Sequence, residues 1–259
     1  MRRRLLAASL ELGVPVVLVA GWWLWSTRSK SFYYPPLPDI LSTFADTWLF
    51  ERVADDVLPS LARLAAGFTI AAIIGIGLGL ALGLSRPARL TLAPTVEFLR
   101  AIPTPALIPV AIVLLGIGDT MRVTIITTAC VWPILLNAID GVAGIDTTLV
   151  ETARSYRVRR LDRVRWVVLP AALPQIFAGM RTSLSVGILV MVVSEMVAST
   201  NGIGFFVLQS QRTFAIPEMW SGILLLGILG YALNFGFTRI ERRVLRWHRG
   251  WRASALGAA

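Results

Sequence analysis

The chain has 259 residues, of which 56% are hydrophobic, and its mean hydropathy is +0.70. A soluble domain carries about 45–50% apolar residues, and several runs here are longer and more apolar than a soluble helix needs, which favours a membrane protein. The formal net charge is +10, but the basic residues lie between apolar runs and are not interleaved with aromatics, which argues against nucleic-acid binding.

Six apolar runs are long enough to cross a bilayer, because a spanning helix needs about 20 mostly apolar residues. We predict an all-α, polytopic membrane protein with one transmembrane domain over residues 1–259. The predicted spans cover approximately residues 5–25, 59–84, 92–115, 120–142, 173–198 and 218–240.

The first predicted span follows the residues MRRR, a beginning that also suits a cleaved signal peptide. Its apolar part is long, however, and it closes on Trp22, Trp23 and Trp25, which suit a membrane interface. No small-residue cleavage site follows the run, so we expect the helix to be retained.

The arginines predict the orientation of these spans. With the N-terminus inside, 17 of the 25 basic residues fall on the inner side, and four fall clearly outside. The inner ones are Arg2, Arg3, Arg4, Arg86, Arg89, Arg154, Arg157, Arg159, Arg160, Arg163, Arg165, Arg239, Arg242, Arg243, Arg246, Arg249 and Arg252. By the positive-inside rule, both termini and the loop at residues 143–172 are cytoplasmic.

Two spans carry packing signals. The second has a small residue at every fourth position, namely Gly67, Ala71, Gly75, Gly79 and Gly83. Such a face lets another helix approach closely, which predicts a tight bundle or a dimer seam rather than a substrate site.

The third predicted span is interrupted by prolines, among them Pro103 and Pro105, which remove helix donors and favour a bend. A bent helix beside a pathway suits a gate, and it equally suits a bend that merely fits the bundle.

Ionisable residues at membrane depth are costly and often functional. Glu97 and Arg100 are three residues apart, so they can pair on one helix face. Arg181 has no obvious partner and is predicted to face a water-filled vestibule. Glu195 lies near the outer end of the fifth span, where it either shapes the pathway and an external contact or orders the outer loop 201–214.

The loop between the fourth and fifth spans contains the basic stretch ETARSYRVRRLDRVRWVVLP, residues 151–170. Val158, Leu161, Val164 and Val168 recur at spacings of three and four, which predicts an apolar stripe on a helix whose other faces carry arginine. Such a helix fits either lipid headgroups or a groove on a partner protein, and the spacing alone does not choose between them.

The same stretch resembles the cytoplasmic signature of permease subunits of bacterial ATP-binding-cassette (ABC) importers. That signature reads Glu-Ala-Ala, three residues, Gly, nine residues, Ile, one residue, Leu-Pro. This chain has Glu151, Thr152 and Ala153, then Arg157 at the glycine position, and finally Val167 before Leu169 and Pro170. Because Arg157 replaces a glycine that permits a positive-φ turn, we expect either a different turn or a helix that runs through it.

The resemblance covers most of the chain. Residues 59–85, 94–120 and 169–184 are similar to the branch that serves alkanesulfonate, taurine and nitrate importers. It implies that the loop forms coupling helices, with Glu151, Thr152, Ala153, Arg157, Val158, Leu161, Leu169 and Pro170 at the contact with an ATPase. It further implies two ATPase copies, a second permease copy forming a homodimer, an external solute-binding protein and the bacterial inner membrane.

Catalytic signatures are missing from the sequence. It has no phosphate-binding loop, and its only lysine, Lys30, falls on the predicted outer side, so ATP and Mg²⁺ are expected on the partner ATPase and no cofactor on this chain. A single cysteine and a single histidine make no zinc site. We therefore predict a non-catalytic transport subunit; the alternatives are an ion-coupled secondary transporter, which needs acid–base pairs near the midplane, and a membrane scaffold whose loop grips anionic lipid.

Overall fold

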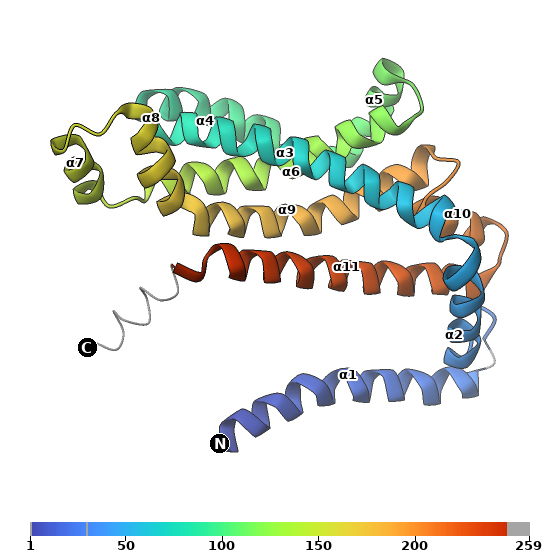
Figure 1. Ribbon diagram of the computed structural model, residues 1–259. Coiled ribbons are helices and arrows are strands. Elements are labelled where there is room, and N and C mark those ends of the chain that lie inside the picture. The colour runs from blue at the N-terminus through green and yellow to red at the C-terminus, as the bar shows by residue number, and fades with distance from the viewer. Residues whose placement is uncertain (1, 30, 248–259) are drawn as a thin grey trace.

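The computed structural model describes residues 2–29 and 31–247 (Figure 1). In chain order the elements are α1 (Arg2–Ser29), α2 (Leu37–Asp46), the π-helical turns η1 (Thr47–Glu51) and η2 (Val53–Val57), α3 (Leu58–Leu84), α4 (Arg86–Ala101), the 3-10 turn η3 (Thr104–Leu107), α5 (Ile108–Leu115), α6 (Asp119–Ala143), α7 (Thr147–Ser155), α8 (Arg160–Arg163), the π-helical turn η4 (Val164–Val168), α9 (Leu169–Ala198), α10 (Ile203–Arg212) and α11 (Ile216–Val244). No strand occurs among these residues, so the predicted all-α class is confirmed.

Four helical stretches of the described chain are long and apolar enough to cross a membrane: Val53–Leu84, Asp119–Ala143, Arg160–Val197 and Ile216–Val244. They contain the second, fourth and sixth predicted spans and all but the last residue of the fifth. The third predicted span is broken, as expected from its prolines: α4 and the stretch Thr104–Leu115 meet at an angle of 79° and give a fifth crossing only if they act as one span.

The break follows from local backbone chemistry. Ile102 and Pro103 are extended, with ψ of 120° and 112°. Ile102 precedes Pro103, and the residue before a proline is disfavoured in the helical region. Pro105 then stands in the first turn of η3, where its missing N–H would have had no helical partner. Pro94, by contrast, lies inside α4 without ending it.

The first predicted span falls within α1, which is one continuous helix. The side chains of residues 2–12 lie outside the description, so membrane crossing by α1 stays a prediction. Figure 1 shows α1 set apart from the bundle, and its C-terminal end is held by aromatic contacts: Trp22 lies 5.4 Å from Trp220 and Trp25 lies 5.1 Å from Tyr34, measured between ring centroids. Trp22 and Trp25 thus hold this end of α1 against the start of α11 and the segment before α2.

The small-residue face of α3 packs directly against α6. A Cβ atom added at Gly67, Gly75 or Gly79 would lie within 2.6, 2.9 and 2.4 Å of side chains on α6. The core of the bundle forms around this seam, with Ala71 and Ile126 both fully buried. The face therefore serves the tight bundle that the sequence predicted, within one copy of the chain.

A second close seam joins α6 to α9. A Cβ at Gly179 would lie 2.7 Å from the Pro133 carbonyl oxygen, and one at Gly187 would lie 2.8 Å from the Cys130 sulfur. Between them the Ser183 hydroxyl donates to the Cys130 carbonyl oxygen over 2.8 Å. Small residues four apart on α9 thus bring α6 and α9 together as those on α3 do.

We expect Gly79→Val to weaken the bundle. The valine Cβ would overlap Ala138 on α6, and such overpacking costs about 1–3 kcal/mol. The higher helix propensity of valine than of glycine offsets only about 0.4 kcal/mol of this cost. Gly77→Val is the matched control, because Gly77 lies on the same helix with nothing within 4 Å of an added Cβ. The midpoint of thermal unfolding in detergent should fall for Gly79→Val and not for Gly77→Val. Equal midpoints for the two variants would show that α3 and α6 can move apart without loss of stability.

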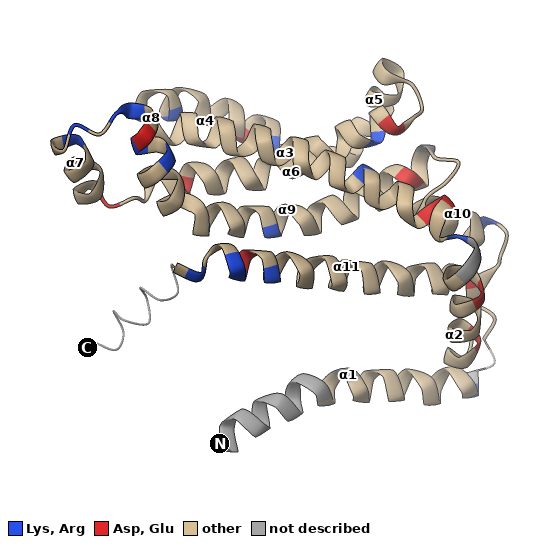
Figure 2. Cartoon of the chain, viewed as in Figure 1, with Lys and Arg blue, Asp and Glu red and all other residues tan. Residues whose placement is uncertain are grey.

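The two ends of the bundle differ. Figure 1 places α7, α8, the start of α1 and the end of α11 towards one end, and α2 and α10 at the other. Figure 2 shows Lys and Arg residues gathered on α7, α8 and the end of α11, with few charged residues along the middle of the helices. The predicted inner side therefore corresponds to one end of the fold.

Candidate functional site

The basic loop folds as two short helices joined by a tight turn. Asp146 begins α7 by accepting a hydrogen bond from the Thr148 backbone N–H over 2.8 Å, as side-chain oxygens do at helix starts. Glu151 and Thr152 are exposed on α7, whereas Ala153 is buried against the rest of the loop. Two of the three residues that match the family signature are thus free to contact a partner.

Arg157 adopts the turn that the family's glycine would allow. Its φ is +52°, its backbone N–H donates to the Arg154 carbonyl oxygen over 2.8 Å, and the Val158 N–H donates to the Ala153 carbonyl oxygen over 3.1 Å. This pair of bonds is a Schellman ending of α7. Both expected alternatives, a different turn and a helix running through, are therefore wrong.

The turn makes a specific prediction for Arg157→Gly. Removing the Cβ from a left-handed residue relieves about 1 kcal/mol, so the variant should assemble normally and unfold at the same or a slightly higher temperature. Arg159→Gly is the control, because Arg159 has a φ of −55° and glycine there only loosens the chain. Loss of assembly in Arg157→Gly alone would show that the guanidinium makes a contact of its own.

Three residues of the predicted apolar stripe, Leu161, Val164 and Val168, lie on the continuous helical stretch Arg160–Val197, whereas Val158 precedes it in the turn. Val168 is buried at the base of the loop, whereas the Leu161 side chain is 83% exposed. Leu169 and Pro170 begin α9 directly after the π-helical turn η4, within the same helical stretch. The stripe is thus divided between an inward base and an outward tip.

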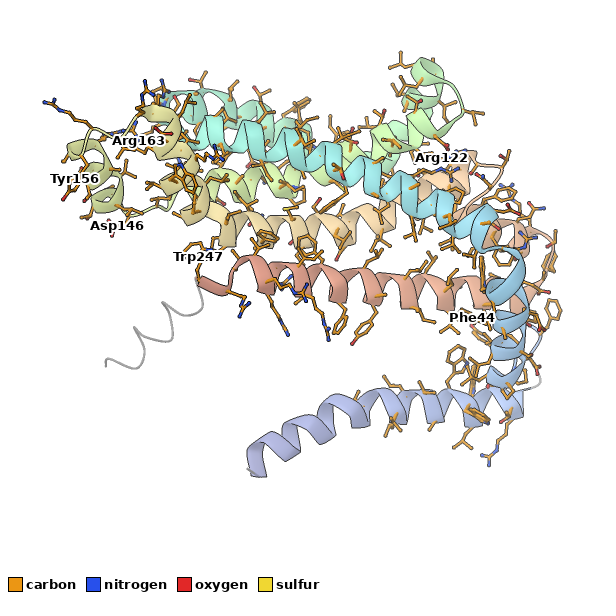
Figure 3. All side chains as sticks on the ribbon, viewed as in Figure 1. Phe44, Arg122, Asp146, Tyr156, Arg163 and Trp247 are labelled. Carbon is orange, nitrogen blue, oxygen red and sulfur yellow. The ribbon has the colours of Figure 1, made fainter. Side chains whose placement is uncertain are left out.

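Large apolar side chains remain exposed on this loop. Tyr156, Leu161 and Trp166 are exposed by 81%, 83% and 69%, and Tyr156 lies at the tip in Figure 3. Aromatic residues are enriched where proteins bind one another. The sequence reasoning missed Tyr156 and Trp166, although both stand within the basic stretch.

At the opposite end of the bundle, Glu195 is fully buried in a network of hydrogen bonds. Its carboxylate accepts from the Ser60 hydroxyl over 2.7 Å, from Arg63 Nη1 over 2.9 Å and from the Gly204 backbone N–H over 3.0 Å. The Ser60 oxygen in turn accepts from the Ile203 N–H over 3.0 Å. Glu195 thus joins α3 and α9 to the first turn of α10.

Arg63 extends the network to α6 and to the turn before α10. Its Nε donates to Asp119 over 2.8 Å, and its Nη2 donates to the Asn201 side-chain oxygen over 2.6 Å. Arg122 also donates to Asp119, over 2.7 Å. Figure 3 shows Arg122 near the end of the bundle opposite Tyr156.

The turn itself requires glycine. Gly202 has a φ of +112°, and a Cβ there would lie 2.5 Å from the Glu195 carboxyl carbon. Its N–H donates to Asp56 over 2.7 Å. Glu195 is thus bonded to the loop that it was expected to order, and its expected role in the pathway or in an external contact stays a prediction.

The other predicted pathway residues lie apart from this network. Glu97 and Arg100 form an exposed pair on α4, as predicted, with Arg100 Nε 2.7 Å from Glu97. Arg181, which had no obvious partner in the sequence and was predicted to face a water-filled vestibule, forms an ion pair with Glu241 on α11. Pro103 and Pro105 mark the bend between α4 and α5. The structure does not bring these residues together into one site.

Comparisons with known proteins agree with this arrangement. A family model described as binding-protein-dependent transport system inner membrane component matches residues 52–249. The chain is 30% identical over 251 residues to the taurine transport system permease protein TauC of Escherichia coli, covering 93% of this chain and 90% of that protein. It is 27% identical over 240 residues to the putative aliphatic sulfonates transport permease protein SsuC of Bacillus subtilis, covering 92% and 87%.

Two further relatives extend the comparison. The bicarbonate transport system permease protein CmpB of Synechococcus elongatus is 35% identical over 190 residues, covering 73% of this chain and 68% of that protein. A solved inward-facing structure of the MetNI methionine ABC transporter superposes with a TM-score of 0.65 at 26% identity, covering 73% of this chain and 94% of that one.

Proposed function

Since the chain belongs to the family of binding-protein-dependent transport system inner membrane components and is an ABC transporter permease subunit, we propose that it forms the translocation pathway of an importer for a small anion. The solute is delivered by an external binding protein. The observation that carries the importer assignment is the family match, which spans α3 to α11 and includes the signature loop.

Coupling to ATP hydrolysis is assigned to the loop α7–α8. Glu151 and Thr152 on α7, together with Leu161 on α8, are exposed at the end of the bundle where the arginines gather. Under this proposal they contact a separate ATPase subunit, which holds ATP and Mg²⁺. The apolar tip of the loop supports the proposal, because side chains that are exposed to water here would be buried in a groove on a partner protein.

The proposed assembly is a permease homodimer with two ATPase copies in the bacterial inner membrane. The arginine-rich end faces the cytoplasm, both termini included, and the chain crosses the membrane six times. The positive-inside rule and the gathering of arginines at one end of the fold support this arrangement. The bend between α4 and α5 is the proposed gate. Backbone groups without helical partners at membrane depth must be buried in protein or line a water-filled space, and a translocation pathway is such a space.

The proposed solute is a sulfonate-, taurine- or nitrate-like anion. The relatives are named for taurine, aliphatic sulfonates and bicarbonate. Each of these three solutes carries a small oxyanion group. The family match favours an ATP-driven importer over the alternative of an ion-coupled secondary transporter.

Uptake by the complete complex in proteoliposomes tests this function. With the binding protein outside and ATP trapped inside, we expect one labelled anion among taurine, ethanesulfonate and nitrate to accumulate, and the same vesicles without ATP to stay empty. Accumulation driven by a proton or sodium gradient in the absence of ATP would refute the importer and support the secondary transporter.

A further inference from the structure

A cavity of about 410 Å³ lies between the base of the loop and the ends of the bundle helices. Arg154, Arg160 and Arg163 line it together with apolar residues that include Leu84 and Val142. It therefore combines basic and apolar groups, and its lining does not include Tyr156, Leu161 or Trp166 of the exposed tip.

The three arginines of this cavity have no acidic partner in the described chain. The ion pairs there join other arginines, namely Arg52, Arg63, Arg100, Arg122 and Arg181, to their carboxylates. Three unpaired guanidinium groups around one space leave an excess of positive charge. That excess favours an anion, and guanidinium geometry suits a phosphate group, which can accept two parallel hydrogen bonds.

The depth of the cavity indicates where the anion comes from. Leu84 ends α3, and Val142 is in the last turn of α6, so these apolar residues mark the inner limit of two spans. A ligand there has hydrocarbon on one side and the cytoplasmic surface on the other. Figure 3 places Arg163 at this end, above the ends of the long helices.

We propose that this cavity binds the phosphate group of an anionic phospholipid, with the headgroup held by Arg154, Arg160 and Arg163 and the acyl chains leaving past Leu84. Basic pockets at the cytoplasmic side of spanning helices recognise such headgroups. The lipid would fill the space between the loop and the bundle and so fix the loop's position. The proposal rests on the proposed orientation, with this loop on the cytoplasmic side of a membrane-spanning chain, and not on the ATPase contact, so its failure would leave that contact untouched.

Lipid binding to the purified complex tests the proposal. In phosphatidylcholine nanodiscs with and without phosphatidylglycerol, native mass spectrometry should show phosphatidylglycerol retained by the wild type. Removing one arginine should weaken retention about fivefold, so the double variant Arg160→Gln/Arg163→Gln should retain almost none. The matched control is Arg159→Gln/Arg165→Gln, which removes the same charge from the same loop outside the cavity lining.

The outcomes separate the possible sources of phosphate. Selective loss in the Arg160/Arg163 variant supports the proposal, and equal retention by both double variants overturns it. A second result would overturn the lipid assignment. In phosphatidylcholine nanodiscs, inorganic phosphate would raise the unfolding midpoint of the wild type but not of the variant, and phosphatidylglycerol would not be retained in preference to phosphatidylcholine. Soluble phosphate would then be the occupant. If the double variant unfolds at a lower temperature than the wild type, Arg163→Lys replaces it in the comparison. This variant keeps the positive charge and should keep most of the retained phosphatidylglycerol.

Discussion

Glu195→Ala is expected to lower the free energy of unfolding by about 3–5 kcal/mol, the cost of leaving one partner of a buried ion pair without the other. Arg63, which is 4% exposed, would lose its buried carboxylate, and Ser60 and the Gly204 N–H would lose an acceptor. Because Arg63 keeps Asp119, we expect a loss near the lower end of that range. The first turn of α10 should open, since its two backbone donors depend on this site.

The measurement is the thermal unfolding midpoint in detergent, together with protease cleavage in the turn at residues 199–202. Glu97→Ala is the control, because the Glu97–Arg100 pair is exposed and should contribute less than about 1 kcal/mol. A Glu195→Ala midpoint no lower than that of Glu97→Ala would show that the buried network does not hold the outer loop.

Glu151→Lys is expected to reduce ATP-dependent uptake by more than about tenfold, since reversing a charge at a protein contact costs about 2–5 kcal/mol. Glu151 is exposed and its carboxylate makes no ion pair in the described chain, so folding should change by no more than about 0.5 kcal/mol. The variant should therefore reach the membrane in normal amount and fail at coupling.

Transport and ATP hydrolysis by the same preparation check this prediction. Asp162→Lys is the matched control, because Asp162 is an exposed acid on α8 at a position that the family signature leaves unspecified. Uptake by Glu151→Lys at the wild-type rate would remove Glu151 from the ATPase contact; equal loss in both variants would assign the effect to the loop's charge rather than to this position.

Sequence patterns with local causes predicted much of the fold. Apolar length found the four spanning helices, and the prolines at positions 103 and 105 predicted the break before α5. The four-residue spacing of small side chains predicted the close face of α3, and the three-residue spacing predicted the Glu97–Arg100 pair. Each of these features depends on neighbours along one helix, so the chain's own periodicity carries the information.

Contacts between distant segments were not predictable in the same way. Arg63 and Glu195 are 132 residues apart, and Arg181 and Glu241 are 60 apart, so pairing them requires knowing how the helices rotate against one another. An available signal was the presence of opposite charges at the same predicted end of the second and fifth spans, which membrane burial makes costly unless they pair.

The error at Arg157 has a different cause. The cost of a Cβ at positive φ, about 1 kcal/mol or more, was taken to decide the turn. Two backbone hydrogen bonds that end α7 are enough to offset it. A signature position can therefore lose its preferred residue and keep its backbone.

The central claim is that this chain works with an ATPase through the loop α7–α8. The most direct measurement is a mild-detergent pull-down of the chain from its native membrane, with mass spectrometry of the proteins retained. The account predicts a phosphate-loop ATPase in a one-to-one ratio with the permease, lost in Glu151→Lys and kept in Asp162→Lys. A chain recovered without any ATPase, under conditions that keep control complexes intact, would contradict it.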